Sequence, residues 1–262
     1  MIGIISLKGG VGKTSVTAAL GDAIASFGKK VLLVDGNLSA PNLGLHFNVV
    51  NPEKSLHHVL DRSVRPSEAV YNLENFDLMP ASLFGRLKAS SPLKLKDRLG
   101  YLKNSYDFIL LDSSPALGDE TLGVMLASDE ILVVTTPDHP TLTNTMKAIK
   151  LARQRGIPIS GLVLNKVHNK SFEMPLNYIE DFVDVPVMAV IPYDINVLRA
   201  LSEFTPSTSY KPRSKGSEEY LKLAAALIGM KYKPSSLRKF LMWVNPEKQD
   251  INRTIFYEEV FK

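Results

Sequence analysis

The stretch Leu7-Lys-Gly-Gly-Val-Gly-Lys-Thr14 decides the fold of this chain of 262 residues. It follows an apolar run at residues 2–6 and leads into a helical pattern that starts at Lys13 or Thr14 and stops at Gly28. Glycines in this position let backbone N–H groups converge on phosphate oxygens, and the positive end of the helix dipole reinforces them. The segment therefore predicts a phosphate-binding loop between a strand and a helix.

The side chains of this loop predict a nucleotide with Mg²⁺. Lys13 would neutralise the β and γ phosphates, and the Thr14 hydroxyl would ligate the metal. Leu7 stands where the motif usually has its first glycine, so the strand before and the helix after carry the assignment. The residues that we expect to line the nucleotide in this loop are Gly9, Gly10, Val11, Gly12, Lys13, Thr14 and Ser15.

Further apolar, β-branched runs alternate with helical patterns along the chain. They lie at residues 31–35, 76–80, 108–112, 130–135, 161–165 and 185–192. This alternation predicts an α/β fold of three layers, a P-loop NTPase fold with a mostly parallel sheet flanked by helices. The last helical pattern of the body ends near Gly229. We therefore expect an ATPase domain at residues 1–229 and a C-terminal helical extension at residues 230–262.

Composition limits the chemistry and the compartment. The chain has no cysteine, which excludes thiolate-ligated zinc and iron–sulfur sites. It has no stretch like a signal peptide and no apolar run near the roughly 18 residues that span a bilayer, so we expect a cytoplasmic protein. Residues 82–104 carry a net +5 and residues 230–262 a net +3, on a body of net −4. These basic segments indicate an acidic partner such as anionic lipid or nucleic acid, or else two solvated helical faces.

A lysine at position 8 is not required for one chain to cradle a phosphate. Lys-Gly-Gly-Val-Gly-Lys-Thr resembles the deviant Walker A motif of the MinD/ParA family of P-loop ATPases, and the resemblance covers nearly all of residues 1–229. Val34-Asp-Gly-Asn-Leu-Ser-Ala-Pro-Asn-Leu-Gly44 is similar to switch I of MinD proteins. The other matching segments are Tyr106-Asp-Phe-Ile-Leu-Leu-Asp-Ser-Ser-Pro-Ala-Leu-Gly118, whose end is more like ParA, Leu162-Val-Leu-Asn-Lys166 and Ile191-Pro-Tyr-Asp194.

The resemblance implies a role for several residues outside the loop glycines. Lys8 would reach across a nucleotide-sandwich dimer to the partner's phosphates, as an arginine finger does. Asp112 would hold the Mg²⁺ shell, and Asn165 would read the adenine, with Pro192 also at the nucleotide. The structural alternatives are a solvent-facing lysine, a helix-capping aspartate and a turn asparagine. His168 stands where GTPases have an aspartate that reads guanine, which favours ATP.

Switch I departs from the family pattern at one position. MinD-like sequences usually have Asp-x-Asp there, and the second aspartate helps to position the attacking water, whereas this chain has Asp35-Gly36-Asn37. An asparagine orients water but cannot accept its proton, although phosphoryl transfer depends largely on positioning and electrostatics. We therefore expect slow ATP hydrolysis. Asp35 would cover part of the catalytic role or polarise the Mg²⁺ shell.

The resemblance implies a molecular switch that is monomeric with ADP and an ATP-dependent homodimer with ATP. Such a MinD-like protein acts in spatial positioning or cell division and binds an anionic membrane surface or a regulatory protein in one state. One alternative is a ParA-type DNA-partition ATPase, whose basic patches would bind DNA. Another is an accessory ATPase of metalloenzyme maturation that works without cysteines.

The C-terminal extension has two interpretations. Leu237, Phe240, Leu241 and Val244 share one face of an expected helix among basic residues, as in helices that lie at a membrane surface. That pattern predicts a peripheral membrane contact. Pro246 and a second apolar set at residues 251–262 favour docking on the body of the protein or across a dimer instead.

Overall fold

The computed structural model describes residues 1–85, 91–232 and 247–261. The described residues form one sheet of eight strands in the order β3-β4-β2-β5-β1-β6-β7-β8. Every neighbouring pair is parallel except β3 and β4. The strands are β1 (Ile2–Ile5), β2 (Val31–Asp35), β3 (Tyr71–Asn72), β4 (Asp77–Met79), β5 (Phe108–Asp112), β6 (Glu130–Thr135), β7 (Ile159–Val167) and β8 (Val187–Pro192).

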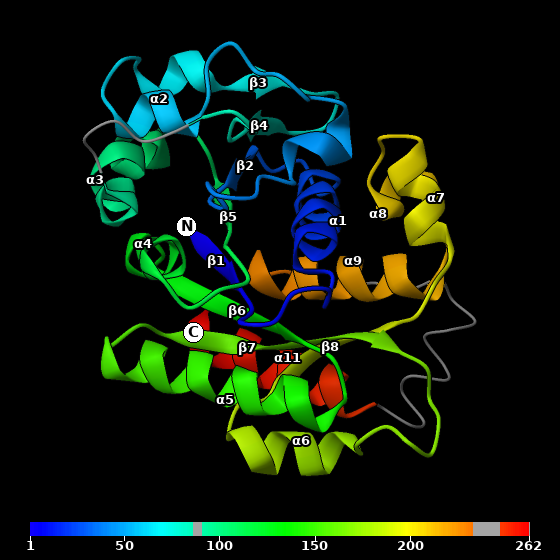
Figure 1. Cartoon of the computed structure of the whole chain (residues 1–262). Coiled ribbons are helices and arrows are strands. Elements are labelled where there is room, and N and C mark those ends of the chain that lie inside the picture. Colours follow the sequence, from blue (N-terminus) through cyan, green and yellow to red (C-terminus); the bar gives the residue numbers. More distant parts are fainter. Residues whose placement is uncertain (86–90, 233–246, 262) are drawn as a thin grey trace.

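Helices cover both faces of this sheet (Figure 1). They are α1 (Lys13–Ala25), α2 (Leu56–Leu60), α3 (Leu95–Leu99), α4 (Asp119–Ala127), α5 (His139–Gln154), α6 (Leu176–Val183), α7 (Asn196–Ser202), α8 (Ser207–Tyr210), α9 (Lys215–Leu227) and α11 (Lys248–Val260). Short 3-10 turns are η1 (Gly44–Phe47), η2 (Pro66–Ala69), η3 (Pro92–Lys94) and η4 (Gly100–Asn104). The predicted three-layer α/β fold is confirmed.

The sheet is apolar on both faces because successive side chains of a strand point to opposite sides. On β2, Leu32 and Val34 join the core under α2 to α6, whereas Leu33 joins the core under α1 and α9. All five residues of β2 are buried. Strand β3 was not predicted from the sequence. It comprises only two residues at the edge of the sheet, paired antiparallel with β4, and so short a strand has no recognisable sequence pattern.

The topology places the functional loops at one edge of the sheet. Strand β1 lies between β5 and β6, so the chain order reverses there, and ligands of open α/β sheets bind beyond the carboxyl ends of strands at such a point. The loops after β1, β2 and β5 leave from this edge. Asp35 and Asp112 end β2 and β5 and are directly paired across the two strands.

The described part of the C-terminal extension packs on the body. Helix α11 covers the edge strand β8 and contacts α9. The buried Arg253 side chain donates from one guanidinium nitrogen to the Met188 carbonyl at 2.7 Å and to Glu219 at 3.0 Å. Asn252 donates to the Val187 carbonyl at 2.7 Å. Covering an edge strand blocks its pairing with other chains, so α11 acts here as part of the fold.

The expected membrane-facing helix with Leu237, Phe240, Leu241 and Val244 lies outside the described residues. The peripheral membrane contact and the boundary between residues 1–229 and 230–262 therefore stay predictions. Within the ranges that the structure describes, no helix combines the length and the apolar character needed to cross a bilayer.

Candidate nucleotide-binding site

The glycine-rich loop connects β1 to α1, and its backbone requires glycine at two positions. Gly10 has φ 82° and Gly12, which caps the N-terminus of α1, has φ 87°. Both values lie in the left-handed region that residues with a Cβ atom rarely adopt. A Cβ on Gly12 would also lie only 2.4 Å from the Asn165 side-chain nitrogen. The loop is thus specified by backbone geometry as well as by space.

The carboxylate of Asp112 gathers the side chains that begin α1. Lys13 Nζ lies 2.7 Å from Asp112 Oδ1, and the Thr14 hydroxyl donates to Oδ2 at 2.7 Å. The Thr17 hydroxyl donates to Oδ1 at 3.1 Å. The Lys13 and Asp112 side chains are only 6% and 1% exposed. A buried pair of this kind needs further hydrogen bonds to offset its desolvation, and the two threonines supply them.

Thr14 and Asp112 are suited to bind a metal ion, and Lys13 is suited to bind a phosphate. A hydroxyl and a carboxylate are hard oxygen ligands of the type that Mg²⁺ prefers, and Mg²⁺ usually keeps several waters. Thr14 and Asp112 could therefore hold the metal directly or through water. In the described ranges, no group of three or more histidine and carboxylate side chains is placed to cage a metal ion by itself.

Asp35 is fully buried and organises the loop that follows β2. Its carboxylate accepts hydrogen bonds from the backbone N–H groups of Asn37 at 3.2 Å, Asn42 at 3.1 Å and Leu43 at 3.0 Å. Burial and the nearby negative charge of Asp112 raise the pKa of Asp35 to about 7, although the backbone donors of Leu43 and Asn37 and the charge of Lys13 oppose the rise. Asp35 is therefore poised to change its protonation when a cation arrives.

Asn37 lies in this loop, and its side chain is also buried. Its Nδ2 donates to the Ala40 carbonyl at 2.5 Å, whereas its Oδ1 has no hydrogen-bond partner in the described part of the chain. Helix α4 also holds this loop. Both carboxylate oxygens of Glu120 accept hydrogen bonds from Ser39, one from its backbone N–H at 3.0 Å and one from its hydroxyl at 3.2 Å. An unsatisfied buried acceptor is costly, so Asn37 Oδ1 is suited to accept from a water.

Lys8 is held within its own chain. Its Nζ lies 2.6 Å from the Thr141 hydroxyl and 3.2 Å from Asp138, which caps the N-terminus of α5. Partial burial opposes ionisation of Asp138, but hydrogen bonds from Thr136, Thr141 and Lys8 outweigh it and lower the pKa of Asp138 to about 2. The Lys8 and Asp138 side chains remain 38% and 43% exposed. Lys8 is thus a paired lysine, and its expected reach to a partner chain stays a prediction.

Asn165 and Lys166, at the end of β7, hold the phosphate loop from the opposite side. Asn165 Nδ2 donates to the Val11 carbonyl at 2.7 Å, and Lys166 Nζ donates to the Gly10 carbonyl at 2.6 Å. Val11 and Asn165 are buried. The expected adenine-reading role of Asn165 stays a prediction, since its amide is bonded to the loop here.

The remaining predicted residues lie around this centre. Gly9 is exposed on the loop, and Ser15 in the first turn of α1 lies 3.4 Å from His46 of η1. Pro192 ends β8, where it pairs with Val167 of β7. The structure therefore brings Lys13, Thr14 and Asp112 into direct contact and places Asp35, Asn37 and Asn165 next to them in the fold.

Sequence analysis missed four residues that support the site. Lys166 follows Asn165 directly and could have been found from that pair, and Asp138 precedes His139-Pro140 as a helix N-cap. Thr17 lies one turn after Lys13 but has no distinguishing motif. Glu120 could not be found, because its partner Ser39 is 81 positions away.

A parallel sheet whose first strand enters a glycine-rich loop, with a lysine and a threonine converging on the aspartate of an adjacent strand, defines a P-loop nucleoside triphosphatase. A family profile described as "AAA domain" matches residues 1–156, and another of the same description matches residues 119–200. The chain belongs to the MinD/ParA family of P-loop ATPases, so the predicted family is confirmed.

Individual relatives agree with this family. The chain is 31% identical over 240 residues, 91% of each chain, to a Methanocaldococcus jannaschii protein described as an uncharacterized ATP-binding protein. It is similar to the cell division ATPase MinD of Pyrococcus furiosus, with 37% identity, a TM-score of 0.78 and coverage of 85% of this chain and 95% of that chain. It is also similar to the septum site-determining protein MinD of Pyrococcus horikoshii complexed with Mg-ADP, with 36% identity, a TM-score of 0.79 and coverage of 86% and 94%.

The raised pKa of Asp35 predicts that Mg-nucleotide binding releases protons. Near pH 7 about half of the Asp35 carboxyls carry a proton, and a divalent cation beside Asp112 would lower their pKa and expel it. Because binding releases protons, affinity should rise as the pH rises from about 6 to about 8 and then level off. Calorimetry of Mg-saturated ADP at pH 7, in two buffers of different ionisation enthalpy, should show the release of up to about half a proton. At pH 9, where Asp35 is already ionised, the buffer dependence should vanish. Equal heats in both buffers at pH 7 would refute the shift.

Proposed function

We propose that this protein binds ATP with Mg²⁺, hydrolyses it slowly and works as a MinD-like, nucleotide-dependent dimerisation switch in spatial positioning or cell division. The observation that carries the proposal is the convergence of Lys13 and Thr14 on Asp112 at the start of α1. The Mg-ADP complex and the ATPase descriptions of the similar MinD proteins support the choice of nucleotide.

Binding of Mg-ATP would exchange partners at this centre. Lys13 would leave Asp112 for the β and γ phosphates, and Asp112 would turn to the Mg²⁺ shell together with Thr14. Mg-ATP carries a net negative charge, which Lys13 and the N–H groups of the loop would meet. Gly9 to Gly12 and Ser15 would line the phosphates, while Asn165 and Pro192 would lie toward the adenine.

The switch would depend on Lys8. An exposed ion pair such as Lys8–Asp138 contributes only about 0–1 kcal/mol, so it is easily exchanged for a stronger one. In an ATP-bound homodimer, Lys8 would leave Asp138 and contact the phosphates of the other chain, where charge-assisted hydrogen bonds are stronger. With ADP the γ-phosphate is absent, and the pair within one chain would be restored.

The hydrolytic step would be organised by the loop after β2. Asn37 has a buried acceptor that can orient the attacking water, but an amide does not take up its proton. Asp35, once ionised beside the arriving Mg²⁺, would polarise the metal shell and hold the backbone N–H of Asn37 in place. Hydrolysis would therefore act as a timer that returns the dimer to monomers.

We place the protein in the cytoplasm, with peripheral attachment to an anionic membrane or to a regulatory protein in the ATP-bound state. The basic segments and the C-terminal extension are the features that support such attachment. The DNA-partition and metalloenzyme-maturation alternatives have no specific contact in the described residues that favours them.

Replacing Lys8 with alanine should abolish ATP-dependent dimers and leave ATP affinity nearly unchanged, because its proposed target belongs to the other chain. Light scattering after size-exclusion chromatography with a non-hydrolysable ATP analogue measures the first effect, and calorimetry measures the second. Lys150→Ala, an exposed lysine on α5, is the matched control and should dimerise normally. A Lys8→Ala protein that dimerises as wild type does would contradict the role in trans.

Replacing Asn37 with aspartate should raise ATP turnover, because it restores a carboxylate at the water-positioning place. A tenfold gain corresponds to about 1.4 kcal/mol of barrier, which is plausible for one restored group. Asn42→Asp adds the same charge to the same loop at an exposed position and should leave turnover near the wild-type rate. Steady-state phosphate release measures the turnover rate. An unchanged or lower rate in Asn37→Asp would mean that hydrolysis is organised by other residues.

A further inference from the structure

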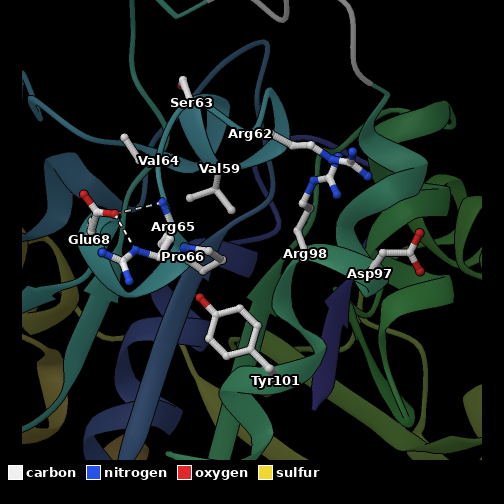
Figure 2. Close-up of a pocket in the computed structure, with 10 residues that line it drawn as sticks. All are labelled: Val59, Arg62, Ser63, Val64, Arg65, Pro66, Glu68, Asp97, Arg98 and Tyr101. Atoms are coloured by element: carbon white, nitrogen blue, oxygen red, sulfur yellow. Dashed lines mark hydrogen bonds and ion pairs between the residues drawn. The ribbon is translucent and has the colours of Figure 1, made fainter.

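A pocket of about 430 Å³ lies away from the nucleotide site, between two segments that are distant in sequence (Figure 2). One wall runs from the end of α2 into η2, and the other comprises the end of α3 and the start of η4. None of its lining residues belongs to the phosphate loop or to the loops after β2, β5 and β7. The side chains that matter here are Arg62, Arg65, Arg98, Pro66, Glu68 and Tyr101.

The three arginines of this pocket differ in their partners. Arg65 lies 3.2 Å from Glu68, which also pairs with Lys54 at 2.9 Å, so Arg65 already has an acidic partner. Arg98 uses its Nε to donate to the Leu60 carbonyl at 3.3 Å, which leaves the rest of its guanidinium group available. Over the ranges that the structure describes, neither Arg62 nor Arg98 has an acidic partner. The Arg62 and Arg98 guanidinium groups are therefore not held in an ion pair with a described carboxylate, although Asp97 also lines the pocket.

The arrangement of these side chains in the pocket points to an anion. Arg62 and Arg98 line the same pocket, and Figure 2 shows their guanidinium groups directed toward one corner of it. The carboxylate of Asp97 points away from that corner in the same view. Like charges that share a cavity repel each other unless an anion lies between them, and guanidinium groups bind phosphate oxygens in a planar, bidentate manner.

The backbone at Arg62 brings its side chain to the pocket. This residue follows Asp61, the C-cap of α2, and has φ 60° in the left-handed region. Glycine or asparagine adopts this conformation with least strain, so an arginine there is unfavourable for the backbone. It does bring a long cationic side chain to the mouth of the pocket. The conformation itself belongs to the end of α2, because the Arg62 N–H donates to the Val59 carbonyl at 3.2 Å and the Ser63 N–H to the His58 carbonyl at 2.9 Å.

We propose that this pocket binds a phosphate ester, with Arg62 and Arg98 on the phosphate and the organic part beside Pro66 and Tyr101. Pro66 is buried in the wall, and the ring of Tyr101 is 49% exposed, so an apolar surface adjoins the cationic corner. Arg98 also belongs to the basic segment at residues 82–104, and in this proposal that segment contributes to binding the phosphate. The phosphate ester is either a soluble molecule or the headgroup of an anionic lipid.

The test uses the full-length protein saturated with Mg-ADP, so that the phosphate loop does not compete for the probe. Phenyl phosphate represents the soluble source, and its binding is measured by calorimetry. Vesicles of phosphatidylcholine with phosphatidic acid represent the lipid source, and pure phosphatidylcholine vesicles serve as the blank in co-sedimentation. The variants are Arg62→Gly and Arg98→Gln, with Lys147→Ala on α5 as a control that also removes one exposed positive charge.

Arg62→Gly separates binding from folding, because glycine relieves the left-handed backbone and should keep or raise the melting temperature. We expect each pocket variant to weaken binding of the effective probe at least tenfold, and Lys147→Ala to bind as wild type does. Binding of phenyl phosphate assigns a soluble ligand, and binding of the acidic vesicles alone assigns a lipid headgroup. The proposal is overturned if wild-type protein binds neither probe, or if Arg62→Gly and Arg98→Gln bind as tightly as wild type.

Discussion

The site depends on one buried carboxylate. Asp112 ends the central strand β5, is 1% exposed and accepts from Lys13, Thr14 and Thr17 at the start of α1. In this buried environment, an ionised aspartate without partners would strongly destabilise the fold. An unpaired Lys13 would do the same. Each therefore fixes the other, and together they fix the first turn of α1 against the sheet. The arrangement holds Lys13, the expected phosphate-binding residue, and Thr14, the expected metal ligand, at one point.

The negative charge of Asp112 also affects Asp35 on the neighbouring strand β2. Asp35 is paired with Asp112 across β2 and β5, and the second negative charge adds to burial in keeping Asp35 partly protonated. Asp35 in turn holds the backbone of the loop that carries Asn37, while Glu120 ties that loop to α4. A change of charge at Asp112 can thus reach both loops that flank the expected γ-phosphate. The proposed switch could use this connection between the two loops without a large rearrangement.

Much of this centre could be predicted from the sequence, because the carboxyl ends of neighbouring parallel strands meet at one edge. The apolar runs before Asp35 and Asp112 were enough to bring both carboxylates to the loop that contains Lys13. The pairing of Lys8 with Asp138, 130 positions away, could not be predicted, because it depends on how α5 is placed beside the loop. The same holds for Arg253 of α11 on Glu219 and for Arg62 beside Arg98, since side chains from separate segments of the chain meet only through tertiary packing.

Lys13 is the residue that we expect to exchange Asp112 for a nucleotide phosphate. Calorimetric titration of Mg-ATP into wild-type protein and into Lys13→Ala measures this most directly. Thr17→Ser, which keeps a hydroxyl near Asp112, serves as the matched control and should bind as wild type does. We expect Lys13→Ala to bind Mg-ATP at least about 100-fold more weakly, a loss of about 2.7 kcal/mol. Wild-type affinity in a folded Lys13→Ala protein would contradict this role of Lys13.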